Sequence, residues 1–176
     1  MKIFKSNRWM GLLISLVFLF SIFVTFSTAQ EKIKAAGKMT LEYTEQHSID
    51  VADSEGHILS IGKMEGINVS TGENKFMDGA KAAAVDGGDY VGGNGPNYGY
   101  GKLTLNGDVV FWKIEGKIIT TLSPDGTPIT TFEGTYTVIK GAGQYENIQG
   151  SGTYKGKLIS ATKAIYEWEG EYFIKK

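Results

Sequence analysis

The alternation of apolar and polar residues is the feature that most constrains the fold of this chain. From about residue 38 onwards, apolar side chains recur with a period of two, and no stretch keeps them at three- and four-residue spacing long enough for a helix. Within residues 38–52, Leu41, Tyr43 and Ile49 fall on one face, whereas Thr40 and Glu42 fall on the other. The alternation therefore predicts an all-β domain.

Turn residues divide this pattern into about eight strands. Asn106-Gly107 is typical of a type I′ hairpin turn, and residues 123–126, Ser-Pro-Asp-Gly, also predict a turn. The expected strands cover residues 38–52, 57–69, 80–86, 103–105, 109–122, 128–139, 147–155 and 161–174.

Eight antiparallel strands can form a closed barrel or an open two-layer sandwich, and two observations favour the barrel. Glycines within the strands, such as Gly116, Gly134 and Gly152, are expected where a strongly coiled sheet bends. Aromatic residues also fall on one face of consecutive strands, as an enclosed lumen requires. The residues expected to face this lumen, and to contact a ligand there, are Tyr43, Trp112, Phe132, Tyr136, Tyr166, Trp168 and Tyr172.

The first 29 residues have the pattern of a secretory signal peptide. A basic start is followed by an apolar stretch at residues 12–26 and by a small-residue cleavage site that ends at Ala29. We expect cleavage after Ala29, although an uncleaved membrane anchor is the alternative. The expected organisation is a signal peptide at 1–29, a flexible segment at 30–37 and one barrel domain at 38–176. The protein is then secreted or periplasmic.

Composition excludes several kinds of protein. Without residues 1–29 the chain has 15 lysines, no arginine and 19 acids, which argues against nucleic acid and anionic membranes as partners. The absence of cysteine excludes disulfides and thiolate chemistry. Two histidines cannot form a three-histidine zinc site, and no nucleotide-binding or nucleophile-elbow motif occurs. We predict no metal and no cofactor. Asn68-Val69-Ser70 matches the pattern of an N-glycosylation acceptor.

Residues 131–156 carry repeated glycine and aromatic positions, TFEGTYTVIKGAGQYENIQGSGTYKG. This pattern resembles the carboxyl-terminal part of the allene oxide cyclase and dirigent barrel families. The resemblance implies an eight-stranded antiparallel barrel with an apolar cavity, often assembled as a homotrimer. It carries over no catalytic residue, because the polar cavity positions of those families do not align with this sequence.

Glu45 and His47 are the candidate catalytic residues. They lie two apart on the first expected strand, so an uninterrupted strand places both on the face of Tyr43. If both enter a cavity, burial and mutual interaction give an acid/base pair. The alternative is that a bulge or the rim of the barrel leaves them solvated.

The segment 86–101 holds seven glycines in 16 residues, so we expect a loop there. It is either a lid over the barrel mouth, with Tyr90, Tyr98 and Tyr100 touching a ligand, or a glycine-rich loop beside a bulged strand edge. The spacing of its acids and glycines does not support a calcium site.

Three functions follow from these observations. The barrel binds a small apolar or phenolic molecule in its lumen, or it is a cofactor-free isomerase or cyclase that uses Glu45 and His47 in the same cavity. The third is a secreted structural or interaction module with a packed core. A cavity of about 300 Å³ or more favours the first two.

Overall fold

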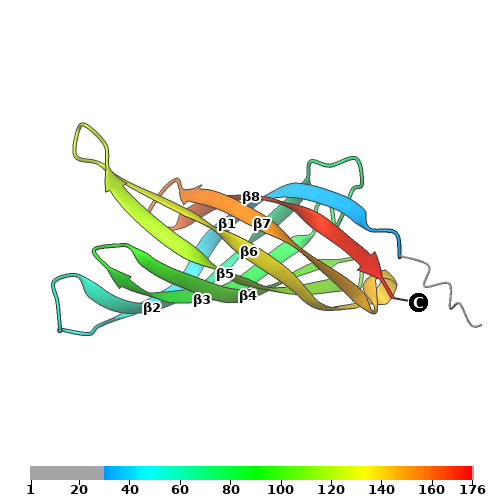
Figure 1. Ribbon diagram of the computed structural model, residues 1–176, viewed down its shortest axis with the longest axis horizontal. Coiled ribbons are helices and arrows are strands. Elements are labelled where there is room, and N and C mark those ends of the chain that lie inside the picture. Colours follow the sequence, from blue (N-terminus) through cyan, green and yellow to red (C-terminus); the bar gives the residue numbers. More distant parts are fainter. Residues whose placement is uncertain (1–29, 176) are drawn as a thin grey trace, which may run out of the picture. The chain divides into compact units, whose positions relative to one another are not determined.

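The computed structural model describes residues 30–175, which form a closed barrel of eight antiparallel strands (Figure 1). Each strand pairs with the next along the chain, and the first strand closes the barrel against the last. The strands are β1 (Ile33–Asp50), β2 (His57–Ser70), β3 (Lys81–Val91), β4 (Gly95–Leu105), β5 (Asp108–Leu122), β6 (Pro128–Ala142), β7 (Ile148–Leu158) and β8 (Lys163–Ile174). The predicted all-β closed barrel is confirmed.

Residues 1–29 lie outside the described residues, and so do the expected signal peptide and the cleavage site at Ala29. Among residues 30–175 no helix has the length and apolar character needed to span a membrane. The expected flexible segment 30–37 is corrected, because β1 begins at Ile33 and pairs with β8 from there onwards.

Lumen aromatics lie against glycines on neighbouring strands. Gly37 is opposite Trp168, and a Cβ atom on Gly37 would lie 2.5 Å from Cζ2 of that indole. Gly101 is opposite Trp112 in the same way, with a corresponding distance of 2.3 Å to Cζ2. The glycines leave room for rings that cross the lumen, which explains why a regular barrel tolerates so many of them.

A β-bulge changes the face of β1 halfway along the strand. Tyr43 is opposite Met64, but the next paired residue is Glu45, which is opposite Lys63. Thr44 is therefore the extra residue, and the side chains that follow it point to the other face of the sheet.

One end of the barrel is closed by the connection between β2 and β3. Phe76 and Met77 in this connection are 7% and 1% exposed, and we call them the plug. The ring of Phe76 packs 4.7 Å from Tyr172 and 6.0 Å from Trp168, measured between centroids. A short 3₁₀ helix, η1 (Gly143–Tyr145), adds the Tyr145 ring at the same end.

Asn68 holds the plug in place. Its side-chain amide donates to the carbonyl oxygens of Phe76 at 3.2 Å and Met77 at 2.8 Å, while its Oδ1 accepts a hydrogen bond from Trp168 Nε1 at 3.0 Å. The side chain is 0% exposed. The glycosylation pattern at Asn68 is therefore inaccessible in the folded domain.

The opposite end, which we call the mouth, is formed by the β1–β2, β3–β4, β5–β6 and β7–β8 turns. Several of these hairpins diverge from one another at the left of Figure 1. The lumen therefore has one end closed by apolar side chains and one end bounded by polar turns.

Candidate functional site

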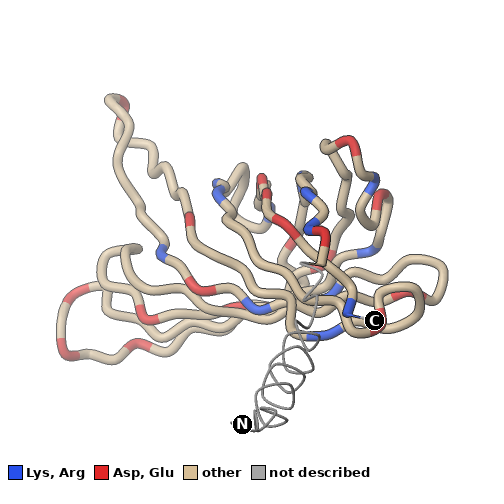
Figure 2. Tube along the Cα trace, turned by 45° about the vertical axis from the view of Figure 1, so that its right-hand side comes forward, with Lys and Arg blue, Asp and Glu red and all other residues tan. Residues whose placement is uncertain are grey.

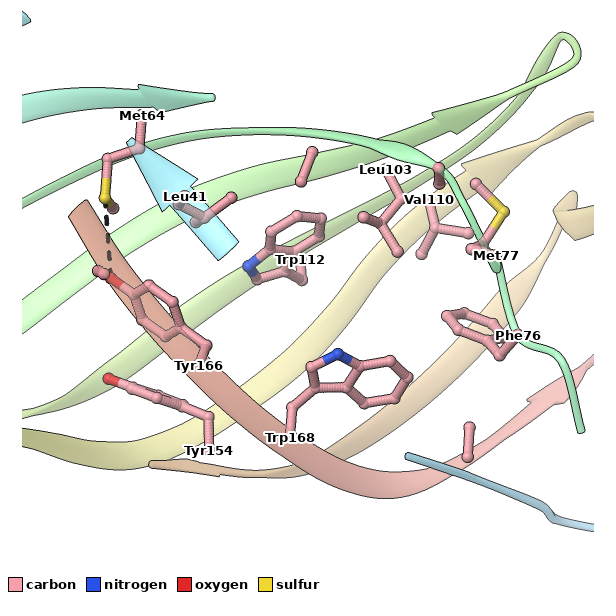
Figure 3. Close-up of a cluster of buried hydrophobic side chains, with 14 of the residues drawn as sticks. Leu41, Met64, Phe76, Met77, Leu103, Val110, Trp112, Tyr154, Tyr166 and Trp168 are labelled. Carbon is pink, nitrogen blue, oxygen red and sulfur yellow. Dashed lines mark hydrogen bonds between the residues drawn. The ribbon is translucent and has the colours of Figure 1, made fainter. Parts of the chain in front are cut away.

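The lumen contains a cavity of about 70 Å³. Its lining includes both inner tryptophans, four inner tyrosines and the two acidic residues Asp86 and Glu171; the tyrosines are Tyr136, Tyr154, Tyr166 and Tyr172. Figure 3 shows the rings of Trp112, Tyr154, Tyr166 and Trp168 crossing the space beside the plug residue Phe76. The cavity is well below the size of about 300 Å³ expected for a typical ligand site, because these rings fill most of the lumen.

The predicted lumen aromatics all lie on the inner side of the barrel. Trp112, Tyr136, Tyr166, Trp168 and Tyr172 line the cavity. Phe132 is 6% exposed and packs on the Tyr166 ring at 4.5 Å between centroids, while Tyr43 is partly buried against the core. Their contact with a ligand stays a prediction.

Glu45 and His47 do not enter the cavity, and of the two alternatives the structure shows the solvated pair beside a bulge. Both side chains are exposed on the outer face, where Glu45 Oε1 lies 2.8 Å from His47 Nε2 and Lys63 binds the other carboxylate oxygen. The hydrogen bond from Lys63, followed by that from His47, lowers the pKa of Glu45. The cause is the bulge at Thr44, which turns the residues after Tyr43 outward.

The segment 86–101 is neither a lid nor a loop, because β3 and β4 extend through it and leave only a short turn after Val91. Tyr90 points inward and is 9% exposed, whereas Tyr98 and Tyr100 are 59% and 62% exposed on the outer face. Glycines such as Gly88, beside which the Tyr90 ring lies, provide close packing within this hairpin.

Asp86 is the polar residue that the sequence interpretation missed. It lies on the inner face of β3 and is only 6% exposed. Tyr43 Oη donates to its Oδ2 in a long hydrogen bond of 3.4 Å. Burial raises the pKa of Asp86 to about 6, although hydrogen bonds from Asn97 and Tyr43 act in the opposite direction.

Four tyrosines surround this carboxyl group from different strands. Burial is the largest cause of the raised pKa of Tyr43, Tyr90, Tyr154 and Tyr166, and the charge of Asp86 adds to the shift in each case. Burial brings the pKa of Tyr90 and of Tyr154 to about 12. We use the name Asp86 cluster for Tyr43, Asp86, Tyr90, Asn97, Tyr154 and Tyr166.

The hydroxyl groups of the cluster are unequally satisfied. Asn97 Nδ2 donates to Tyr90 Oη at 3.1 Å and to the carbonyl oxygen of Gly87 at 3.2 Å. Tyr166 Oη makes only a weak contact with Met64 Sδ at 3.8 Å. Tyr154 Oη is buried and has no hydrogen-bond partner among the described residues. In Figure 3 the hydroxyls of Tyr154 and Tyr166 both point away from Phe76, which belongs to the plug.

The sequence does contain a signal for Asp86. The alternation places it on the same face of its strand as Ala82, Ala84 and Tyr90, all of which point inward. The neighbouring face carries Ala83 and Val85, which are also apolar, so the pattern alone does not tell the inner face from the outer one. Within residues 30–175 no group of three or more histidine or acidic side chains is arranged to hold a metal ion.

No known protein family and no curated protein matches this sequence. Solved structures that are similar in fold include the following three. A pterocarpan synthase dirigent protein is 11% identical, with a TM-score of 0.47, and the match covers 84% of this chain and 88% of that one. A protein of unknown function from the DUF3224 family of Shewanella oneidensis is 18% identical, with a TM-score of 0.44, and the match covers 83% and 99%. A pyocyanin demethylase is 14% identical, with a TM-score of 0.43, and the match covers 77% and 98%.

A dirigent protein is therefore among the structures that this barrel resembles. The narrower resemblance to allene oxide cyclases stays a prediction. Because all three similarities are remote, no ligand or activity is carried over from them.

Proposed function

We propose that this barrel binds a small molecule in its lumen, with aromatic rings supplying contact area and the Asp86 cluster fixing orientation. The observation that carries the proposal is a carboxyl group and an unpartnered hydroxyl buried beside an internal cavity. A buried polar group without a partner destabilises the fold, so its retention is typical of a functional site.

The size of the cavity restricts the ligand. A space of about 70 Å³ holds only a few non-hydrogen atoms. We therefore expect a small apolar or phenolic molecule, or the end of a larger one that enters from the mouth. Tyrosine hydroxyls and the Asp86 carboxyl then provide the hydrogen bonds.

Thermal unfolding of the protein against a panel of phenolics, oxylipins, terpenoids and fatty acids tests this function. A ligand that binds only the native state raises the unfolding midpoint. Ala84 lines the cavity, so Ala84→Leu fills it and is expected to abolish the shift. The matched control is Ala83→Leu on the opposite face of the same strand, which is expected to keep the shift. Equal ligand responses in both variants would contradict a lumen site.

A second candidate function is a structural or interaction module, and the small volume of the cavity favours it. For such a module no compound shifts the midpoint, and Ala84→Leu changes stability alone. The cyclase alternative loses its proposed acid/base pair, because Glu45 and His47 lie on the outer face.

Export and assembly remain part of the proposal. We propose secretion or periplasmic export with cleavage after Ala29 and a homotrimer of the mature domain. Intact mass of the exported protein tests the cleavage, and light scattering tests the number of subunits.

A further inference from the structure

The Asp86 carboxyl has no cationic partner among the described residues. Ten ion pairs connect side chains of residues 30–175, and none of them includes Asp86. The groups that face it are the phenols of the Asp86 cluster, from β1, β3, β7 and β8, and the Asn97 amide from β4. Gly62 lies opposite it on β2 and contributes no side chain. A buried carboxylate without a countercharge is expensive to keep.

The walls around this carboxyl suit a positive charge. Tyrosine and tryptophan faces attract ammonium groups, and the attraction grows when the cation is desolvated. Trp112, Tyr154 and Tyr166 line the same cavity as Asp86. The unpartnered Tyr154 oxygen adds a hydrogen-bond acceptor.

The charge at the mouth also favours a cationic ligand. The strand ends and turns at 50–57, 89–95, 122–128 and 158–163 carry five acids, one lysine, Lys163, and one histidine, His57, which pairs with Asp53 and Asp89. These acids are Asp50, Asp53, Glu55, Asp89 and Asp125. Figure 2 shows acidic positions at the tips of the hairpins, and such a ring of charge attracts cations towards the opening.

From these observations we infer that the ligand of the lumen is a small organic cation, an alkylammonium group whose charge meets the Asp86 carboxylate. The inference rests on the proposed binding function and specifies its ligand class. The cavity of about 70 Å³ limits the buried part to a methylated ammonium head of a few non-hydrogen atoms.

Three probes of similar shape and different charge test this inference: trimethylammonium, neutral tert-butanol and anionic pivalate. At pH 7.5 we expect trimethylammonium, at about a hundred times its Kd, to raise the unfolding midpoint by about 9 °C. We expect the two other probes to have little effect. Asp86→Asn is expected to weaken trimethylammonium binding at least about tenfold by calorimetry.

A control variant away from the mouth separates local charge from general acidity. Glu65→Gln changes an exposed acid on the outer face of β2, and it is expected to leave the affinity for trimethylammonium within about twofold of the original. Affinity is also expected to fall as the pH drops below about 6, where Asp86 takes up a proton.

The possible failures are distinguishable. If tert-butanol or pivalate binds as well as the cation, or if Asp86→Asn keeps full affinity, the cationic ligand class is wrong while the binding function stands. If no probe and no panel compound shifts the midpoint or the tyrosine ring signals in NMR spectra, both proposals fail.

Discussion

Two buried polar side chains, Asn68 and Asp86, lie in the same lumen and differ in how well they are satisfied. Asn68 is fully buried, and its oxygen and both amide hydrogens have partners within 3.2 Å. Asp86 is almost as buried, but among side chains its carboxyl group hydrogen-bonds only with the Asn97 amide and with Tyr43, whose hydrogen bond is long at 3.4 Å, and no cation pairs with it among the described residues. The first is an arrangement that stabilises a fold, and the second is one that leaves capacity for a ligand.

The difference follows the two halves of the barrel. At the plug end, Asn68 connects Trp168 to the β2–β3 connection, so every hydrogen bond serves to close the barrel. Towards the mouth, inner positions are tyrosines with raised pKa values around one carboxyl group. The stability of the domain therefore depends on the plug, while any ligand chemistry depends on the Asp86 cluster.

Replacement of Asn68 is expected to have the largest effect on stability. Asn68→Ala removes the hydrogen-bond partner of the Trp168 indole N–H and of the Phe76 carbonyl oxygen, and one of the two bonds to the Met77 carbonyl oxygen, which costs about 3 kcal/mol or more. Urea denaturation followed by tryptophan fluorescence measures the change. Asn94→Ala is the control, since Asn94 also bonds to the backbone but is exposed, and its loss is expected to cost about 1 kcal/mol.

Equal losses in the two asparagine variants would contradict the special role of the plug. A loss below about 1 kcal/mol in Asn68→Ala would show that the β2–β3 connection closes the barrel without this side chain.

Replacement of Asp86 is expected to stabilise the fold, whereas replacement of Asn68 destabilises it. Its folded pKa of about 6 lies above that of an unfolded aspartate, so the stability of the fold falls as the pH rises from about 4 to about 6, and the full loss is present above that range. Asp86→Asn is expected to raise the free energy of unfolding by about 2 kcal/mol at pH 7.5 and by much less near pH 4. Denaturation at several pH values measures this difference.

Glu169→Gln provides the control, because Glu169 is an exposed acid on β8. Its effect is expected to stay within about 0.5 kcal/mol at every pH. If Asp86→Asn destabilises the protein at pH 7.5, then the carboxylate is better satisfied than its contacts indicate.

The alternation of apolar and polar residues predicted some features of the barrel and missed others. The barrel was predictable, because alternation and strand glycines extend along the whole domain. The bulge in β1 was only one of two alternatives, because the extra residue Thr44 has no sequence signature that decides which face Glu45 and His47 take. Asp86 stayed hidden for a related reason: both faces of its strand carry small apolar residues, and burial is a property of the closed barrel.

Two tyrosines, one without a hydrogen-bond partner and one with a partner, test the same comparison with a smaller expected effect on stability. Tyr154→Phe removes a buried hydroxyl that has no partner, so it is expected to be neutral or to stabilise the fold by up to about 1 kcal/mol. Tyr90→Phe removes the acceptor of the Asn97 amide and is expected to destabilise by about 1 kcal/mol. Parallel urea denaturation curves decide between them, and a larger loss in Tyr154→Phe than in Tyr90→Phe would contradict the assignment.

The smallest expected effect on stability comes from the exposed acids Asp53 and Asp89, which, unlike the buried Asp86, interact with a histidine. His57 lies between two carboxylates, with its Nδ1 bonded to Asp53 and its Nε2 2.6 Å from Asp89. The hydrogen bond to Asp53, followed by that to Asp89, raises the pKa of His57. The resulting stabilisation is complete below the ordinary histidine pKa and is lost as the pH rises through the raised value.

An NMR titration of the His57 ring measures this shift. Asp89→Asn is expected to lower the His57 pKa towards its ordinary value, because one of the two carboxylates is gone. Asp125→Asn, in the β5–β6 turn, is the control and is expected to leave the titration unchanged. If the His57 pKa does not respond to Asp89→Asn, the contact between His57 at the start of β2 and Asp89 on β3 does not persist in solution.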